Sequence, residues 1–138
     1  MKDDRLTASV SMDLAASADE VWRVVGDFGG LARWHPWVPA CELSPDGQTR
    51  TMRVGDEIVA VERLLESTPF AHVYTVDQGP FPMTVYRAEL SVASSASGCR
   101  VRYHGRFRPT TTEVDVAAKL QRFFEVGFAA LAARFSPG

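Results

Sequence analysis

Glu62 is the residue of this 138-residue chain whose setting points most directly to chemistry. Side chains alternate between the two faces of a strand, and this places Glu62 on the same expected face as the apolar Ile58, Ala60 and Leu64. A carboxylate on an apolar face is costly unless it is paired. Arg50, on the preceding expected strand, reaches Glu62 if a three-residue loop joins the strands, but not across a two-residue turn.

Two readings of Arg50 and Glu62 remain open. In the first, they form an ion pair that only fixes the sheet. In the second, Arg50 binds a carbonyl or carboxylate of a ligand, and Glu62 orients the ligand or acts as a base with a raised pKa. The catalytic candidates are therefore Glu62 and Arg50.

Tyr74 and Tyr86 have the parity of apolar strand faces, so both are expected to point inward. A buried phenol needs a hydrogen-bond partner, and each tyrosine is either a donor to a ligand oxygen or a core residue tied to its neighbours. His72 shares the parity of Tyr74 but sits at a strand end, and His35 lies in a loop. We expect both histidines to face solvent.

The last expected strand has one apolar and one basic face. Tyr103 and Phe107 belong to the apolar face, and the basic stripe, expected to face water, consists of Arg100, Arg102, His104, Arg106 and Arg108. The chain has a net charge of −2 and no exposed aromatic residues interleaved with the stripe, so nucleic acid is not an expected partner.

Other chemistries find little support in the sequence. No Ser/His/Asp or Cys/His set can be assembled, no spacing suggests a metal site, and no cofactor is expected. Cys41 and Cys99 are read as reduced thiols. The chain lacks an N-terminal apolar segment and any apolar run near the roughly 18 residues of a membrane span. We therefore expect no membrane insertion and a cytoplasmic location. The protein is expected to be a monomer or a homodimer.

The elements that position these residues follow from periodicity and turn signals. Ser17 and Glu20 form a capping box for a helix from Ala18 to Gly29-Gly30, and a second short turn follows at 31–34. Thr112 is expected to cap a long helix from Glu113 to about Arg134. About seven strands are expected, over 7–14, 41–44, 49–54, 57–67, 72–78, 83–93 and 99–109.

Two features suggest a cavity between the sheet and the final helix. All three tryptophans fall within 22–37, in a segment bent by glycines and a proline that would close one end of a curved sheet. Phe81, between two prolines, forms a stiff loop that is a lid or a plug of the sheet, and Gly127 in the final helix leaves room for a ligand or a close sheet contact.

This element order resembles the START-like, helix-grip superfamily, specifically the polyketide cyclase/dehydrase branch of the SRPBCC families. The residues that carry the resemblance span nearly the whole chain: Val21-Trp22, Asp27-Phe28, Leu31, Trp34 with Pro36, Arg50, Glu62-Arg63-Leu64, Tyr74, Pro82, Tyr86, Phe107 with Pro109, and Gly127 with Leu131. Tyr103 departs from the pattern, because related sequences tend to carry a tryptophan there.

The resemblance implies an α+β helix-grip fold for one domain over 1–138, with a cavity that accepts small hydrophobic, aromatic or polyketide-like molecules. Its members include cyclases, carriers and receptors, so three functions stay open: a binder, a cofactor-free cyclase, aromatase or dehydratase that works by positioning and acid/base catalysis, and a carrier of lipid-like ligands. The expected ligand-binding residues are Trp34, Trp37, Arg50, Glu62, Tyr74, Phe81, Tyr86, Tyr103, Phe107, Phe124 and Phe128.

Overall fold

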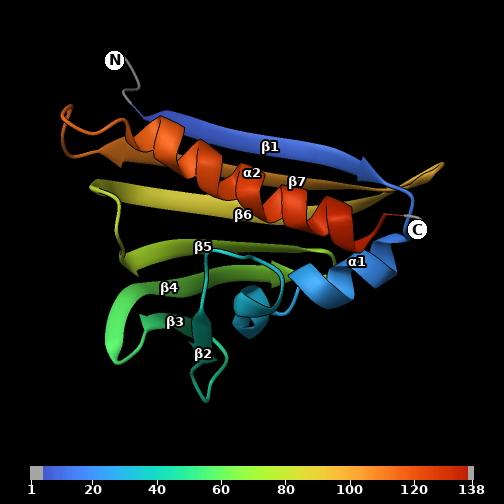
Figure 1. Ribbon diagram of the computed structural model, residues 1–138, viewed down its shortest axis with the longest axis horizontal. Helices are drawn as coiled ribbons and strands as arrows, with labels where there is room; N and C mark the ends of the chain where they lie inside the picture. The colour runs from blue at the N-terminus through green and yellow to red at the C-terminus, as the bar shows by residue number, and fades with distance from the viewer. Residues whose placement is uncertain (1–4, 137–138) are drawn as a thin grey trace.

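The computed structural model describes residues 5–136 and contains one curved antiparallel sheet of seven strands, as the sequence predicts (Figure 1). The strands lie in the order β1-β7-β6-β5-β4-β3-β2. Apart from β1, which pairs with β7, each strand pairs with its neighbours in sequence, as short hairpin connections require. The strands are β1 (Leu6–Leu14), β2 (Ala40–Leu43), β3 (Thr49–Val54), β4 (Glu57–Thr68), β5 (Ala71–Gln78), β6 (Met83–Ser95) and β7 (Gly98–Pro109).

Two short helices connect β1 to β2. The helix α1 (Ala18–Val25) begins at the predicted capping box, where the Ser17 hydroxyl accepts a hydrogen bond from the Glu20 amide. It ends at Gly26 rather than at Gly29-Gly30, and the 3-10 helix η1 (Phe28–Arg33) takes up the two glycines instead. The bend predicted from the glycines is therefore present, one helix turn earlier than expected.

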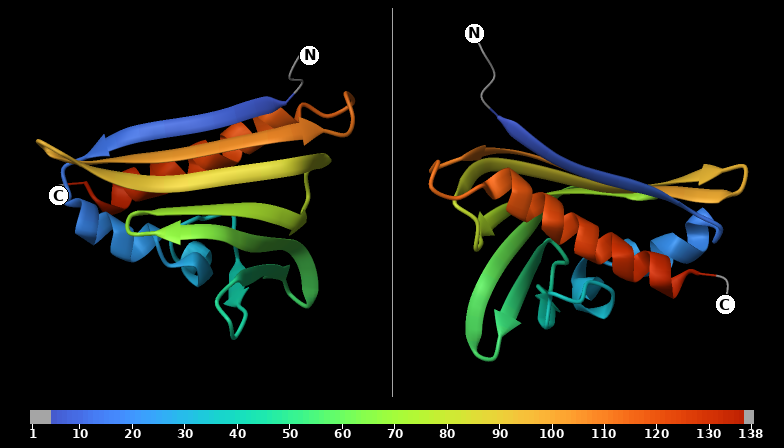
Figure 2. Two further views of the ribbon diagram at one scale, coloured as in Figure 1. Left: turned by 180° about the vertical axis from the view of Figure 1, so that it is seen from behind. Right: turned by 45° about the horizontal axis from the view of Figure 1, so that its top comes forward.

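The long helix α2 (Val116–Arg134) lies across the concave face of the sheet (Figure 2). Its predicted end is correct, but its predicted start is three residues too early. Asp115, and not the predicted Thr112, caps the helix by accepting a hydrogen bond from the Ala118 amide. Acceptors at both positions can cap a helix, so the sequence alone does not separate them.

Gln121 ties α2 to the open edge of β1. Its side-chain amide donates to the Ser9 carbonyl at 2.7 Å, and its oxygen accepts from the Ser9 amide at 2.8 Å. These bonds satisfy backbone groups that an edge strand leaves unpaired. They hold the helix over the β1 side of the sheet, and the views in Figure 2 show β3 and β4 curving away from it.

A β-bulge in the β3–β4 hairpin decides which side chains share a face. The turn has two residues, Gly55 and Asp56, and alone would place Arg50 and Glu62 on opposite faces. The pairing then shifts by one residue between Met52 and Arg53, and Arg50 comes directly opposite Glu62.

The same bulge corrects one predicted face. It turns Ile58 outward, where it is exposed instead of sharing the buried face of Glu62. A second irregularity, at Val85 with φ 54°, likewise turns Thr84 out of the face that Tyr86 occupies. Insertions of one residue reverse strand parity, which is why simple alternation fails at these two positions.

Strict alternation does hold along β7, as predicted. Val101, Tyr103, Gly105 and Phe107 are buried, and the basic stripe lies on the other face, with Arg100, Arg102 and Arg108 exposed and His104 and Arg106 half-buried. No helix within residues 5–136 has the length and apolar character needed to span a membrane.

Candidate functional site

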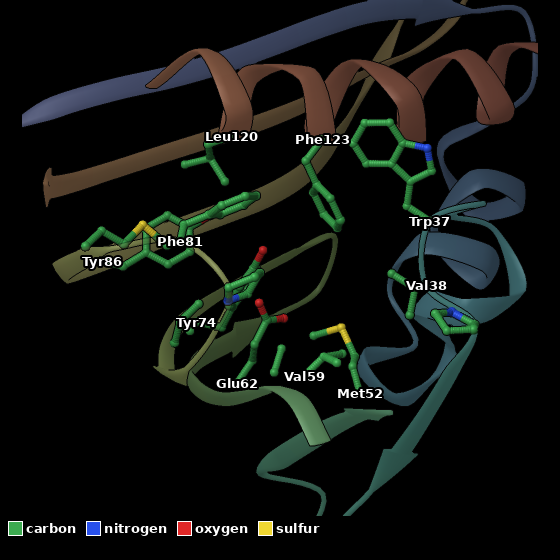
Figure 3. Close-up of a pocket in the computed structure, with 15 residues that line it drawn as sticks. Trp37, Val38, Met52, Val59, Glu62, Tyr74, Phe81, Tyr86, Leu120 and Phe123 are labelled. Atoms are coloured by element: carbon green, nitrogen blue, oxygen red, sulfur yellow. The ribbon is translucent and has the colours of Figure 1, made fainter. Parts of the chain in front are cut away.

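A pocket of about 130 Å³ lies between α2 and the part of the sheet formed by β3, β4, β5 and β6 (Figure 3). Leu120 and Phe123 point into it from α2, and Glu62 points toward them from the opposite wall. Two loops complete its rim, the segment 37–39 before β2 and the segment 80–81 before β6. The lining residues are Trp37, Val38, Pro39, Met52, Val59, Ala60, Glu62, Tyr74, Val76, Pro80, Phe81, Met83, Tyr86, Leu120 and Phe123.

Arg50 and Glu62 are in contact, which confirms the predicted pair. The Arg50 Nε donates to Glu62 Oε1 at 2.7 Å, and Arg50 Nη2 lies 2.7 Å from the same oxygen. Arg50 Nη1 donates to the Phe28 carbonyl of η1 at 3.1 Å. The guanidinium therefore joins the sheet to the bent segment, while the carboxylate borders the pocket.

Aromatic rings hold the guanidinium on two sides. Its central carbon lies 4.2 Å from the centre of the Phe28 ring and 4.6 Å from that of Tyr74. Such cation–π contacts stabilise a cation that has lost its water. They fix Arg50 below the floor of the pocket, so that Glu62, and not Arg50, presents the charged atoms to it.

Burial raises the pKa of Glu62 above its ordinary value, and the positive charge of Arg50 opposes this only in part. Burial by itself would lower the pKa of Arg50, but the Glu62 charge raises it, so that the guanidinium stays protonated. A carboxyl group with a raised pKa beside a fixed cation can accept a hydrogen bond, bind a proton or release one.

The three tyrosines of the concave face differ in their hydrogen bonding. The hydroxyl groups of Tyr74 and Tyr103 bond to each other. The Tyr86 hydroxyl is buried beside the pocket and has no partner of full hydrogen-bond geometry within residues 5–136. Burial, then the neighbouring Tyr103, raises the pKa of Tyr86 well above its ordinary value, although the nearby Tyr74 hydroxyl lowers it to a lesser degree. Tyr86 is therefore a neutral donor at physiological pH.

The prediction that His35 is exposed is wrong: its exposed fraction is 1%. The ring stacks on Phe123 with centroids 4.0 Å apart, and its Nδ1 accepts from the Trp37 amide at 3.1 Å. Nε2 must therefore carry the proton, and it donates to the Phe123 carbonyl at 2.8 Å. This histidine fixes the loop at 37–39 to α2.

Gly127 makes that contact possible. A Cβ at this position would lie 2.7 Å from Cδ2 of His35 and 3.0 Å from Cζ3 of Trp34. The glycine thus leaves room for the bent segment, not for a ligand or for the sheet as predicted.

His72 is also buried, contrary to prediction, with an exposed fraction of 2%. Its ring packs against Trp22 of α1 and Phe28 of η1, with centroid distances of 5.7 and 5.5 Å. Two helices thus cover this end of β5, which the pattern of the strand alone does not reveal. Burial, reinforced by the charge of Arg50, lowers the pKa of His72 to about 3.

The predicted ligand-binding residues separate into two groups. Trp37, Glu62, Tyr74, Phe81 and Tyr86 line the pocket. The others are buried outside its lining: Trp34, Arg50, Tyr103, Phe107, Phe124 and Phe128.

Several lining residues were not predicted, although some carried a signal. Val76 has the parity of Tyr74, and Met52 has the parity of Arg50. Leu120 and Phe123 lie one turn before Phe124 and Gly127 on the inner side of α2, so helical spacing from the predicted Phe124 was the signal for Leu120. Within residues 5–136, no three His, Cys, Asp or Glu side chains gather as metal ligands.

Comparison with known proteins agrees with this geometry. Solved structures with the same fold include a protein from Thermobifida fusca, with 35% identity and a TM-score of 0.74 over 96% of this chain and 93% of the other. A START superfamily protein from Mycobacterium smegmatis has 17% identity and a TM-score of 0.69, covering 95% of this chain and 96% of its own.

The di-domain ARO/CYC StfQ of the steffimycin biosynthetic pathway matches with 14% identity and a TM-score of 0.73. The match covers 95% of this chain and 50% of StfQ. Among curated proteins, none matches. A sequence model of the family described as "Polyketide cyclase / dehydrase and lipid transport" matches residues 5–136, and this chain, with its START-like helix-grip fold, belongs to that family.

Proposed function

We propose that this protein binds a small hydrophobic molecule, about one aromatic ring in size, in the pocket between α2 and the sheet. The observation that carries the proposal is a largely apolar pocket of about 130 Å³ whose wall contains Glu62 and the hydroxyl of Tyr86, which has no partner within the described residues. A dry apolar cavity of roughly 150 Å³ accommodates a benzene ring. Apolar walls with a few placed polar groups are the usual composition of small-molecule sites.

The polar pair specifies the chemistry of the ring's substituent. A carboxylate accepts hydrogen bonds, and the buried Tyr86 hydroxyl has a proton to donate and no partner within the described residues. A phenolic hydroxyl satisfies both, because it donates to the carboxylate and accepts from the tyrosine. We therefore expect a hydroxylated ring to bind more tightly than its unsubstituted counterpart.

Calorimetric titration with p-cresol and with toluene tests this proposal. The expected preference for p-cresol is about fivefold or more, since a net hydrogen bond contributes roughly 1 kcal/mol. Val59→Trp, which fills the pocket, should abolish binding of both compounds. Val54→Trp, at an exposed position near the β3–β4 turn, is the matched control and should leave binding unchanged. Binding that survives Val59→Trp would contradict the proposal.

A second candidate, an acid/base enzyme of the cyclase, aromatase or dehydratase type, is favoured by the setting of Glu62. The raised pKa of this carboxyl, its contact with Arg50 and its position in the pocket wall suit a proton-transferring group. In such an enzyme Glu62→Gln should leave ligand affinity within a few-fold and reduce turnover about 10²–10⁴-fold. Undiminished turnover in Glu62→Gln would show that Glu62 is not the base. If the protein is instead a carrier of lipid-like ligands, it should form no product from any bound compound.

The proposal treats residues 1–138 as one START-like domain, acting in the cytoplasm as a monomer or homodimer. Support for a reducing location comes from Cys41 and Cys99, which are both free thiols. Sedimentation of the purified protein at several concentrations would decide between the two oligomeric states.

A further inference from the structure

A surface groove of about 450 Å³ adjoins the pocket. It is lined by Trp37, Phe81, Asp115, Ala118, Lys119 and Arg122. Trp37 and Phe81 line the pocket as well, so these two side chains form the boundary between the two spaces. Trp37 is 52% exposed, which is unusual for so large an apolar side chain.

The groove carries two cations that have no ion-pair partner among residues 5–136. Lys119 and Arg122 are exposed and lie three residues apart on α2, which places them on adjacent turns of one helix face. Neither forms an ion pair with another residue of the described chain, 5–136, whereas Arg33, Arg63, Arg87 and Arg100 all do so. The one acid of the groove, Asp115, already accepts the Ala118 amide as the helix cap.

The positive character of the groove is local. The whole chain has a net charge of −2, so its overall field does not attract anions. The pocket on the other side of Trp37 and Phe81 is apolar, and its one charged group, Glu62, is neutralised by Arg50. An apolar pocket and a cationic groove thus lie on the two sides of Trp37 and Phe81.

We propose that the bound molecule is an amphiphilic anion. Its ring fills the pocket, its linker passes between Trp37 and Phe81, and a carboxylate or phosphate at its far end contacts Lys119 and Arg122. This inference rests on the proposed function and adds the class of ligand to it. It also accounts for how a molecule larger than one ring is held, because the pocket alone, at about 130 Å³, has no space for more.

Calorimetry with ω-phenyl acids of three to six chain carbons, each compared with the alcohol of the same length, tests the proposal. The acid of best-fitting length should bind about three- to tenfold more tightly than its alcohol, because two exposed ion pairs contribute modestly each. The corresponding phenylalkyl phosphate identifies the preferred end group, since a larger preference for it assigns a phosphate and a smaller one a carboxylate. Raising the salt concentration from 50 to 500 mM should reduce the preference for either anion.

The variant Lys119→Gln/Arg122→Gln should remove the preference for the acid and leave the affinity for the alcohol unchanged. The matched control is Arg23→Gln/Arg102→Gln, which removes two exposed cations outside the groove and changes the net charge equally. It should retain the preference.

Two results would overturn the proposal of an amphiphilic anion and leave the pocket as a binding site. The first is equal binding of acid and alcohol, and the second is a preference for the acid that survives Lys119→Gln/Arg122→Gln. If neither compound binds although p-cresol does, the amphiphilic anion is overturned and the pocket stands; if p-cresol does not bind either, the proposed function fails as well.

Discussion

The concave side of the sheet under β7 is filled with aromatic rings, whereas the same side under β3 and β4 encloses a pocket. In the packed half, Tyr103 of β7 stacks on Phe124 of α2 with centroids 4.0 Å apart and an interplanar angle of 14°. In the pocket half, the facing side chains are smaller ones, such as Met52, Val59 and Ala60. The side chains are thus large where α2 lies close to the sheet, and small where α2 lies farther from it.

The contrast shows how one fold separates stability from binding. Gln121 holds α2 to the β1 edge, and the curvature of the sheet then carries β3 and β4 away from the helix. Rings fill the narrow side, and nothing in the described chain fills the wide side. The tyrosine hydroxyl groups follow the same division, since Tyr103 has a hydroxyl partner and Tyr86 has none within the described part of the chain.

Arg50 of β3 lies beneath the pocket, and its replacement should have the largest effect. Arg50→Met removes the cation but leaves the Glu62 carboxylate buried. Breaking one side of a buried ion pair typically costs about 3–5 kcal/mol. We expect a loss of that size in the free energy of unfolding, measured with urea at pH 7.

Two outcomes sharpen this prediction. Because burial raises the pKa of Glu62 and Arg50 opposes it, the loss should shrink at lower pH, where the carboxyl becomes neutral. Arg50→Met/Glu62→Leu, with no charge left to bury, should recover most of the stability. A loss below 1 kcal/mol in the single variant would show that water already reaches the pair.

Truncating a side chain in each half compares the packing directly. Phe124→Ala in the packed half should cost about 3–5 kcal/mol of unfolding free energy, because it leaves a cavity among fixed neighbours. Val59→Ala in the pocket half should cost about 1 kcal/mol, because its side chain already borders an open space. Urea unfolding measures both losses. Each loss is compared with that of Leu131→Ala, a substitution at a fully buried position of α2. A Val59→Ala loss of about 3 kcal/mol, the upper value for a fully buried valine side chain, would mean that the pocket is closed in solution.

Much of this division was predictable, because it follows from strand parity and helix periodicity. Alternation along β7 correctly gave the buried Tyr103 and Phe107 and the outward basic stripe. The capping box correctly predicted the start of α1. The contact between Arg50 and Glu62 was one of two possibilities, since it depended on the loop between the two strands.

The errors occurred where tertiary packing or a bulge overrides a local pattern. Ile58 points outward because one extra residue reverses the parity of the strand, a feature without a clear sequence signal. His35 and His72 are buried by elements that approach from elsewhere in the chain, α2 for the first and α1 with η1 for the second. The pocket's extent depends on the distance between α2 and β4, which no local pattern encodes.

His72 provides a pH test of the packed region beside Arg50. Its pKa falls to about 3 in the folded protein, from an ordinary 6.5. Between these values the unfolded chain binds one more proton, so stability decreases as the pH falls from about 6.5, by roughly 1.4 kcal/mol per pH unit. His72→Leu removes this contribution. From pH 7 to pH 5, the native protein should lose about 2 kcal/mol more than the variant.

Urea unfolding of both proteins at half-unit steps of pH measures that difference. His35, whose pKa burial also lowers, is present in both proteins and cancels in the comparison. Parallel pH profiles would contradict the burial of a neutral His72 ring among Trp22, Phe28 and Tyr74.

The smallest expected effect compares two tyrosines, one from each half. Tyr103→Phe leaves the buried Tyr74 hydroxyl without its partner and should cost about 1–2 kcal/mol of unfolding free energy. Tyr86→Phe removes a hydroxyl that has no partner within residues 5–136, so its cost should be within about 0.5 kcal/mol of zero. For p-cresol affinity the order reverses: Tyr86→Phe should weaken it about fivefold, because the ring's oxygen loses its donor, and Tyr103→Phe should leave it unchanged. A Tyr86→Phe loss of stability equal to that of Tyr103→Phe would show that the Tyr86 hydroxyl is already bonded in the free protein, and the pocket half would then be as fully satisfied as the packed half.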